Sequence, residues 1–166
     1  MIRFPIKNRG LMVTKIISGG QTGVDRAALD VAIELGLPCG GWCPRGRRAE
    51  DGRLPDHYPL LETSSASYRE RTRLNVQDSD GTLVISGGKP RGGTALTISW
   101  AKRLKKPVLR TNKSKFVARN VLQWIDDNKI TVLNIAGPRE SQNPGIYSQT
   151  IGILRGLLAS AVKTAQ

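Results

Sequence analysis

The sequence predicts an α/β fold, a doubly wound parallel sheet with helices on both faces. Short apolar runs of strand length alternate with longer amphipathic segments of helical period along most of the chain. Three of the apolar runs end in glycine-rich turns, which begin at Ser18, Ser86 and Gly137. Parallel strands joined by helices end at one edge of their sheet, and ligands of such folds bind beyond that edge. We therefore expect the three turns to form one ligand-binding edge.

The order of the elements favours a Rossmann-like form of this fold, in which right-handed crossovers join the parallel strands. Gly36 ends the first helix as a C-cap residue, and we expect Ser114 to cap the fourth helix and Val117 to face inward from it. The expected strands are 13–18, 38–42, 82–85, 107–110 and 131–136, and the expected helices are 24–35, 68–77, 95–104, 115–128 and 146–163.

A chain of 166 residues is long enough for one domain with a sizeable core. We expect a single Rossmann-like ligand-binding domain at 13–166 and a flexible N-terminal extension at 1–12. That extension has no apolar stretch of the kind found in signal peptides, and no apolar run approaches the roughly 18 residues that span a membrane. These features predict a cytoplasmic protein with reduced thiols and no membrane partner.

The turn after the strand at 82–85 carries the densest set of anion-binding features. Within 86–94 it holds four glycines, Lys89, Arg91 and Thr94, directly before a helix. Backbone N–H groups and the positive end of the dipole gather at a helix N-terminus and attract anions. Thr94 could cap that helix or donate to a ligand oxygen. The spacing matches neither the Walker loop nor the dinucleotide motif GxGxxG.

The stretch 43–65 is the least regular part of the sequence, and it carries several arginines. Loops this long inside a compact domain are usually functional or disordered. Its cations could close over an anion, or the stretch could be a solvated basic loop.

The charge balance favours anionic ligands. The chain has 26 Lys+Arg against 13 Asp+Glu, a formal net charge of +13. None of its eight aromatic residues is interleaved with basic residues as base-stacking surfaces require, and no nucleic-acid-binding motif occurs. We expect no specific nucleic acid partner, although a basic nucleic-acid-associated protein stays an alternative.

The sequence gives no metal site and no catalytic set. Cys39 and Cys43 have no second cysteine pair, and the single histidine, His57, is distant in the sequence. No Ser/His/Asp set is spaced for acyl transfer. We expect neither a metal ligand nor a catalytic residue.

Five motifs together resemble the molybdenum cofactor carrier family, whose fold is similar to that of the LOG-like (lysine-decarboxylase-like) Rossmann proteins. They are SGGQTGVDR at 18–26, GWCP at 41–44, GGKPRGGT at 87–94, GPRES at 137–141 and PGIY at 144–147. The resemblance runs from about residue 13 to residue 158. Each turn alone is common, but the combination is fairly specific.

The resemblance implies a homo-oligomer that binds the pterin-based molybdenum cofactor (molybdopterin), protects it from oxidation and passes it on without catalysis. Molybdoenzymes or cofactor-synthesis proteins would be donors or recipients. In that family the dithiolene of the pterin holds the metal. The motif positions that would bind the cofactor are Gly19, Gly20, Gln21, Thr22, Arg26, Gly87, Gly88, Lys89, Arg91, Gly92, Gly93, Thr94, Arg139, Glu140 and Ser141.

The related LOG-type hydrolases release a base from nucleoside monophosphates, and they carry a PGGxGTxxE signature with a catalytic Glu. Thr97 stands at that Glu position here, and Ser86 replaces the Pro. The missing carboxylate favours binding over turnover, because the hydrolysis needs a general acid or base. Glu140 could substitute from another loop, so a phosphoribohydrolase or a nucleotide-binding sensor stays the alternative.

Self-association is also expected from the last helix. It is more apolar than one buried stripe requires, and Gly152 and Gly156 lie four residues apart on one face. Glycine inside a helix costs about 1 kcal/mol relative to Ala, so a close helix approach should offset it. That approach is either to the chain's own sheet or to a second copy, as a dimer or tetramer.

Overall fold

The structure, a computed structural model, describes residues 13–162; the N-terminal extension expected at 1–12 lies outside the described residues. A parallel sheet of five strands in the order β2-β1-β9-β7-β8 forms its centre. The strands are β1 (Lys15–Ile17), β2 (Cys39–Gly40), β7 (Gly81–Ile85), β8 (Val108–Thr111) and β9 (Val132–Ala136). Each neighbouring pair runs parallel, so the predicted fold class is confirmed.

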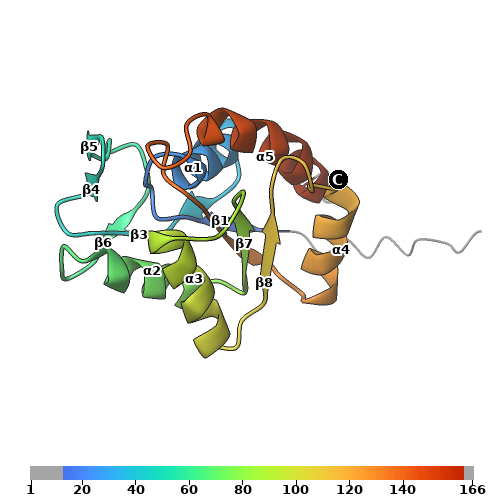
Figure 1. The fold of residues 1–166 in the computed structure, drawn as a ribbon, viewed down its shortest axis with the longest axis horizontal. Coiled ribbons are helices and arrows are strands. Elements are labelled where there is room, and N and C mark those ends of the chain that lie inside the picture. Colours follow the sequence, from blue (N-terminus) through green and yellow to red (C-terminus); the bar gives the residue numbers. More distant parts are fainter. Residues whose placement is uncertain (1–12, 163–166) are drawn as a thin grey trace, which may run out of the picture.

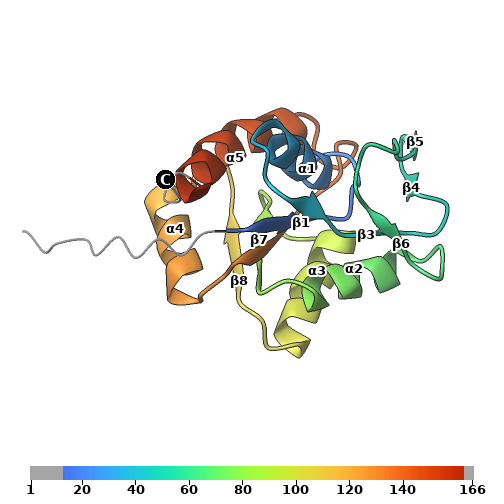
Figure 2. The same ribbon diagram turned by 180° about the vertical axis from the view of Figure 1, so that it is seen from behind.

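Helices cover both faces of the sheet (Figure 1). Helix α5 packs against α1 and α4, and side chains of these three helices share one core cluster with β7 and β9. Helices α2 and α3 pack together on the opposite face, as Figure 2 shows from behind. The bounds are α1 Val24–Glu34, α2 Tyr68–Gln77, α3 Gly92–Arg103, α4 Ala118–Asp127 and α5 Ile146–Val162. None of the helices within 13–162 is long and apolar enough to cross a membrane.

The last strand of the chain, β9, lies in the middle of the sheet between β1 and β7. If the chain began at β9, the sheet order would read 3-2-1-4-5, which is the Rossmann order. Helix α5, which follows β9, shares one core cluster with Val13, just before β1. The chain is therefore a Rossmann sheet with its sequence order circularly shifted.

The expected strand at 38–42 is split in the structure. Gly41, at φ 132°, breaks it, and a Cβ there would lie 2.2 Å from the carbonyl oxygen of Ser18. Beyond the break, the Asn75 side chain of α2 accepts from the backbone N–H of Trp42 at 2.7 Å and donates to its carbonyl at 3.0 Å. The chain leaves the main sheet here as β3 (Trp42–Cys43), which pairs with β6 (Leu61–Glu62).

Residues 42–63 form a folded side lobe. It contains the hairpin of β4 (Arg48–Ala49) and β5 (Gly52–Arg53). Arg47 is buried and donates to four backbone carbonyls of the lobe, at 2.9–3.2 Å. A small core of Leu54, Tyr58 and Leu60 packs the lobe onto Leu29 of α1. Arg47 therefore holds the lobe together, and the stretch is a folded lobe and not an open solvated loop.

Two helix starts differ from the sequence expectation. Helix α3 begins three residues early, at Gly92, so Thr94 lies within its first turn and does not cap it. Helix α4 begins at Ala118 without a side-chain cap, and Val117 is 50% exposed instead of facing inward. The Ser114 hydroxyl donates to the side chain of Asn112 at 2.7 Å in the preceding turn. Ser114 therefore stabilises this turn and does not cap α4.

Gly152 and Gly156 are exposed on α5, and no atom lies within 4 Å of a Cβ added at either position. Packing against the chain's own sheet does not explain these two glycines. Self-association stays a prediction, which light scattering at physiological salt would check.

The close packing of β7, β9 and α1 predicts a sharp difference between two glycines. A Cβ at Gly137 would lie 2.4 Å from the carbonyl oxygen of Ile85 and 2.5 Å from Val24, whereas a Cβ at Gly87 meets nothing within 4 Å. We expect Gly137→Ala to lower the free energy of unfolding by about 1–3 kcal/mol through overpacking. Gly87→Ala, the matched control, should change it by less than about 0.5 kcal/mol. Urea denaturation measures both, and equal values would contradict the packing described here.

Candidate functional site

A cavity of about 510 Å³ opens at the edge of the sheet where β7 and β9 end. We call it the outer cavity. Its volume lies in the range of small-molecule sites. The turns after both strands contribute to its wall: Ser86, Gly87, Gly88, Lys89, Pro90, Arg91, Thr94, Pro138, Gln142 and Asn143. The edge expected from the sequence is thus the edge where the cavity forms.

The turn after β7 presents charge and backbone donors to the outer cavity. Lys89 and Arg91 are exposed, and Arg91 is the N-cap residue of α3. Gly88 and Gly92 adopt positive φ values of 66° and 50°, which glycine allows without strain. The guanidinium of Arg110 on β8 donates to the carbonyl of Gly88 at 2.8 Å and fixes the turn from outside.

The hydroxyl of Ser86 is enclosed and has no hydrogen-bond partner among the described residues. Ser86 is 4% exposed and lines the outer cavity. An enclosed polar group without a partner costs about 1–3 kcal/mol. A ligand with polar oxygens in this cavity would supply the missing partner.

A smaller inner cavity of about 120 Å³ adjoins the outer one, because Thr94 and Gln142 line both. It lies between α1, α2 and α3. Its lining residues are Gln21, Asp25, Tyr68, Arg71, Thr72, Gly93, Thr94, Leu96, Thr97, Ala136, Gly137, Arg139 and Gln142.

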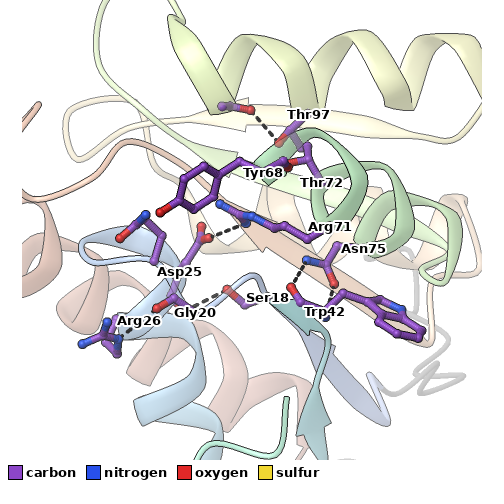
Figure 3. A network of polar contacts seen from close by, with 12 residues as sticks. Ser18, Gly20, Asp25, Arg26, Trp42, Tyr68, Arg71, Thr72, Asn75 and Thr97 are labelled. Atoms are coloured by element: carbon purple, nitrogen blue, oxygen red, sulfur yellow. Dashed lines mark hydrogen bonds and ion pairs between the residues drawn. The ribbon is translucent and has the colours of Figure 1, made fainter. Parts of the chain in front are cut away.

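A buried ion pair forms part of the wall of the inner cavity (Figure 3). Arg71 of α2 donates to Asp25 of α1 at 3.1 Å, and the two side chains are 12% and 6% exposed. A Cβ at Gly19 would lie 1.6 Å from the Arg71 guanidinium, so this glycine makes room for it. Burial raises the pKa of Asp25, and the charge and hydrogen bond of Arg71 oppose that rise.

Tyr68 sets the positions of two cations at the inner cavity. The guanidinium of Arg71 lies 5.7 Å from the centre of its ring, and that of Arg139 lies 5.1 Å from it. Both distances are typical of cation–π contacts. Figure 3 shows the Tyr68 ring beside Arg71 and above Asp25.

Several motif residues hold the side lobe onto the sheet edge. The carboxylate of Glu50 in the lobe accepts from the hydroxyls of Thr22 and Ser141 and from the Ser141 backbone N–H. Partial burial raises the pKa of Glu50, but these hydrogen bonds outweigh it and hold the pKa below its usual value. Arg26 makes two hydrogen bonds to Asp51, both at 3.0 Å, and a third to the carbonyl of Gly20.

Glu140 acts as a cap on α5. Its carboxylate accepts from the backbone N–H groups of Gly145 and Tyr147, at 2.5 and 2.9 Å. A carboxylate at a helix N-terminus is favoured by the dipole. Glu140 lines a third, more open side cavity of about 290 Å³, together with Thr22 and Arg26.

The structure thus divides the residues that the sequence assigned to the cofactor. At the outer or inner cavity lie Gln21, Gly87, Gly88, Lys89, Arg91, Gly93, Thr94 and Arg139; at the side cavity lie Thr22, Arg26 and Glu140; and Gly19, Gly20, Gly92 and Ser141 line none of the three. Gly19 and Gly20 instead make room for Arg71 and for Leu60 of the lobe.

Sequence reasoning missed Asp25, Tyr68 and Arg71 as site residues. Asp25 stands inside a matching motif, so its position carried a signal. Arg71 is one of three arginines along 68–77, and nothing in the sequence separates it from Arg69 and Arg73. Only the packing of α2 against the Ser18–Gly23 turn selects it.

Thr97 lies in the wall of the inner cavity, 6% exposed, and its hydroxyl donates to the carbonyl of Gly93 at 2.9 Å. The sequence position of the hydrolase Glu is therefore at the site, with a hydroxyl in place of a carboxylate.

No group of three or more His, Cys, Asp or Glu side chains within 13–162 is placed to hold a metal ion. Burial raises the pKa of the Cys39 and Cys43 thiols, which disfavours the thiolate that metal ligation needs.

The structure is a circularly shifted Rossmann sheet with glycine turns and cations lining two adjoining cavities at the edge where β7 and β9 end. The chain belongs to the circularly permutated YpsA SLOG family, whose model matches residues 16–158. A crystal structure from Syntrophus aciditrophicus SB, named "Putative molybdenum carrier protein", is 49% identical with a TM-score of 0.86. The match covers 89% of this chain and 96% of that one. No curated protein is significantly similar in sequence. The family resemblance seen in the motifs is confirmed.

Two tyrosines at the side cavity should resist ionisation. The hydroxyls of Tyr58 and Tyr147 each donate to Asp30 at 2.7 Å. Burial and this carboxylate raise the pKa of Tyr58 and bring that of Tyr147 to about 12. Because the folded pKa exceeds the unfolded one, the stability from these contacts is complete below about pH 10 and is lost as the pH rises through the folded values.

Ultraviolet titration of the phenolates tests this, and Asp30→Asn should lower both raised pKa values. Asp51→Asn is a control, because it removes a neighbouring carboxylate that does not contact either tyrosine hydroxyl. Identical titration curves for wild type and Asp30→Asn would show that Asp30 does not set the tyrosine pKa values.

Proposed function

We propose that this protein binds the molybdenum cofactor at the outer and inner cavities, shields it and passes it to a cofactor-requiring protein without catalysis. The observation that carries the proposal is the pair of adjoining cavities, one bounded by the Ser86–Thr94 turn and the other by Arg71 and Arg139. The molybdenum cofactor combines a phosphate, a pterin and an oxyanionic metal centre. It therefore has hydrogen-bond acceptors for the donors of both cavities. The structural neighbour named as a molybdenum carrier supports the same ligand.

The donor set suits a carrier. Backbone N–H groups, hydroxyls and a few cations bind anions strongly enough for retention, and each contact is individually reversible. The metal would stay on the dithiolene of the pterin, which agrees with the raised pKa of the Cys39 and Cys43 thiols. Release would then need no covalent step.

Binding of anaerobically prepared molybdenum cofactor tests the proposal. We expect Lys89→Ala and Arg91→Ala each to raise the Kd by roughly 5- to 150-fold, the worth of about 1–3 kcal/mol for a charged hydrogen bond. Arg119→Ala, which removes the same kind of charge from the exposed surface of α4, is the matched control. An unchanged Kd in both loop variants would place the site elsewhere.

Protection and transfer have separate readouts. The bound cofactor should lose activity in air more slowly than the free cofactor, and it should restore activity to a cofactor-free molybdoenzyme. Tight binding with no transfer would identify a storage or sensing role instead.

We also propose that the protein does not hydrolyse nucleotides. Thr97 cannot supply a proton-transfer carboxylate, and both oxygens of Glu140 accept hydrogen bonds from the start of α5. We expect incubation with nucleoside monophosphates to release no base above background. Turnover that disappears in Asp25→Asn or Glu140→Gln would show that one of these carboxylates replaces the missing Glu.

A further inference from the structure

The inner cavity holds two enclosed hydrogen-bond donors that no group in the described part of the chain accepts. They are the side-chain nitrogen Nε2 of Gln21 and the Nε of Arg71. Gln21 is 4% exposed, and both residues line the cavity. Each unpaired donor costs about 1–3 kcal/mol, so two at one small cavity indicate a missing acceptor.

The orientation of the Gln21 amide is fixed by its neighbours. Its Oε1 accepts from the backbone N–H groups of Thr22 and Glu50, at 3.0 and 2.9 Å. Because N–H groups can only donate, this side of the amide must be the oxygen, and the NH₂ must occupy the unpartnered side. The chain therefore presents a donor there.

The local charge is also positive. Two guanidinium groups, Arg71 and Arg139, lie at the cavity against one carboxylate, Asp25. A buried ion pair alone is weak evidence for stability, since apolar residues of similar volume often stabilise as well or better. The Arg71 guanidinium lies in the space that a side chain at position 19 would fill, so a glycine at this position makes room for it. Two cations against one carboxylate leave the cavity with a net positive charge, which favours an anionic acceptor.

From these observations we infer that the inner cavity is a subsite for a small oxyanionic group, bound by Gln21, Arg71 and Arg139. Its volume of about 120 Å³ suits one compact group and not a fused ring with its substituents. The rest of the ligand would extend past Thr94 into the outer cavity. Two ends of the cofactor share the required chemistry, the phosphate and the metal-oxo centre. The subsite deepens the proposed function and rests on it for the identity of the whole ligand.

Gln21→Glu is the variant that tests the proposed subsite most directly. It is isosteric, it keeps the acceptor for Thr22 and Glu50, and it turns the unpartnered donor into an anionic acceptor. Gln77→Glu makes the same charge change at an exposed position on α2, where the side chain accepts from Arg73. Arg71→Lys is a second variant, which keeps the charge and removes the Nε donor. Circular dichroism and urea unfolding establish that each variant is folded.

Isothermal titration calorimetry with inorganic phosphate and with molybdate measures the subsite directly. We expect at least one anion to bind wild type and Gln77→Glu alike, and Gln21→Glu and Arg71→Lys to weaken it by roughly tenfold or more. Arg119→Ala, which removes a cation from the exposed surface of α4 away from both cavities, should change this affinity by less than about threefold. Preference for phosphate assigns the phosphate end to the subsite, and preference for molybdate assigns the metal-oxo end.

Absence of binding by both anions, or equal affinity in wild type and Gln21→Glu, would overturn the subsite. Its failure is separable from that of the proposed function. If the whole cofactor binds equally well to wild type and Gln21→Glu, the carrier role stands and the subsite is wrong. If the inorganic anion depends on Gln21 but the cofactor does not bind, the subsite stands and the carrier role is wrong.

Discussion

Close backbone packing at one edge of the sheet is the constraint on which the rest of the structure depends. A Cβ at Gly23 would lie 2.4 Å from the carbonyl oxygen of Pro138, and one at Gly137 would lie 2.4 Å from that of Ile85. The turns after β1, β9 and β7 are thus held in direct contact, in the order of their strands. Because these turns touch, the outer cavity joins residues 86–94 with 138–143, and the inner cavity joins residues as far apart in the sequence as Gln21 and Gln142. Because the last strand, β9, lies between β1 and β7, the turn after it contacts turns from much earlier in the chain.

The side lobe gives the basic sequence a structural role that net charge alone does not suggest. Arg47 is used to bind carbonyl groups inside the lobe, and Arg26 is used to bind Asp51 at its tip. The hydroxyls of Thr22 and Ser141 both donate to Glu50, so each already has a partner in the side lobe. At the outer and inner cavities the cations are Lys89, Arg91, Arg71 and Arg139, four of the 26 Lys+Arg of the chain.

Much of the site was predictable because the signals are local. Glycine turns after apolar runs, with Lys89 and Arg91 before a helix, follow from backbone chemistry that any strand–turn–helix unit shares. Motif membership was a weaker guide to which side chains line the outer and inner cavities. Thr22, Arg26, Glu140 and Ser141 stand inside matching motifs, yet their polar atoms bond to the lobe, to a backbone carbonyl or to the start of α5. A matching motif identifies a side chain, but it does not tell which group in the folded protein that side chain contacts.

The sequence by itself determined the fold class, the shared edge of the three turns and the family, since apolar periodicity and turn residues act over a few neighbours. It also determined that Thr97 stands where the LOG-type hydrolases have their catalytic Glu, because this follows from the residue at a single position of the motif. The place of β9 in the middle of the sheet and the fold of residues 42–63 were decided only by tertiary structure. So was the choice of Arg71 among three arginines of α2. Its selection depends on the distance to Asp25, 46 residues earlier, and on the space above Gly19, and neither is encoded in local pattern.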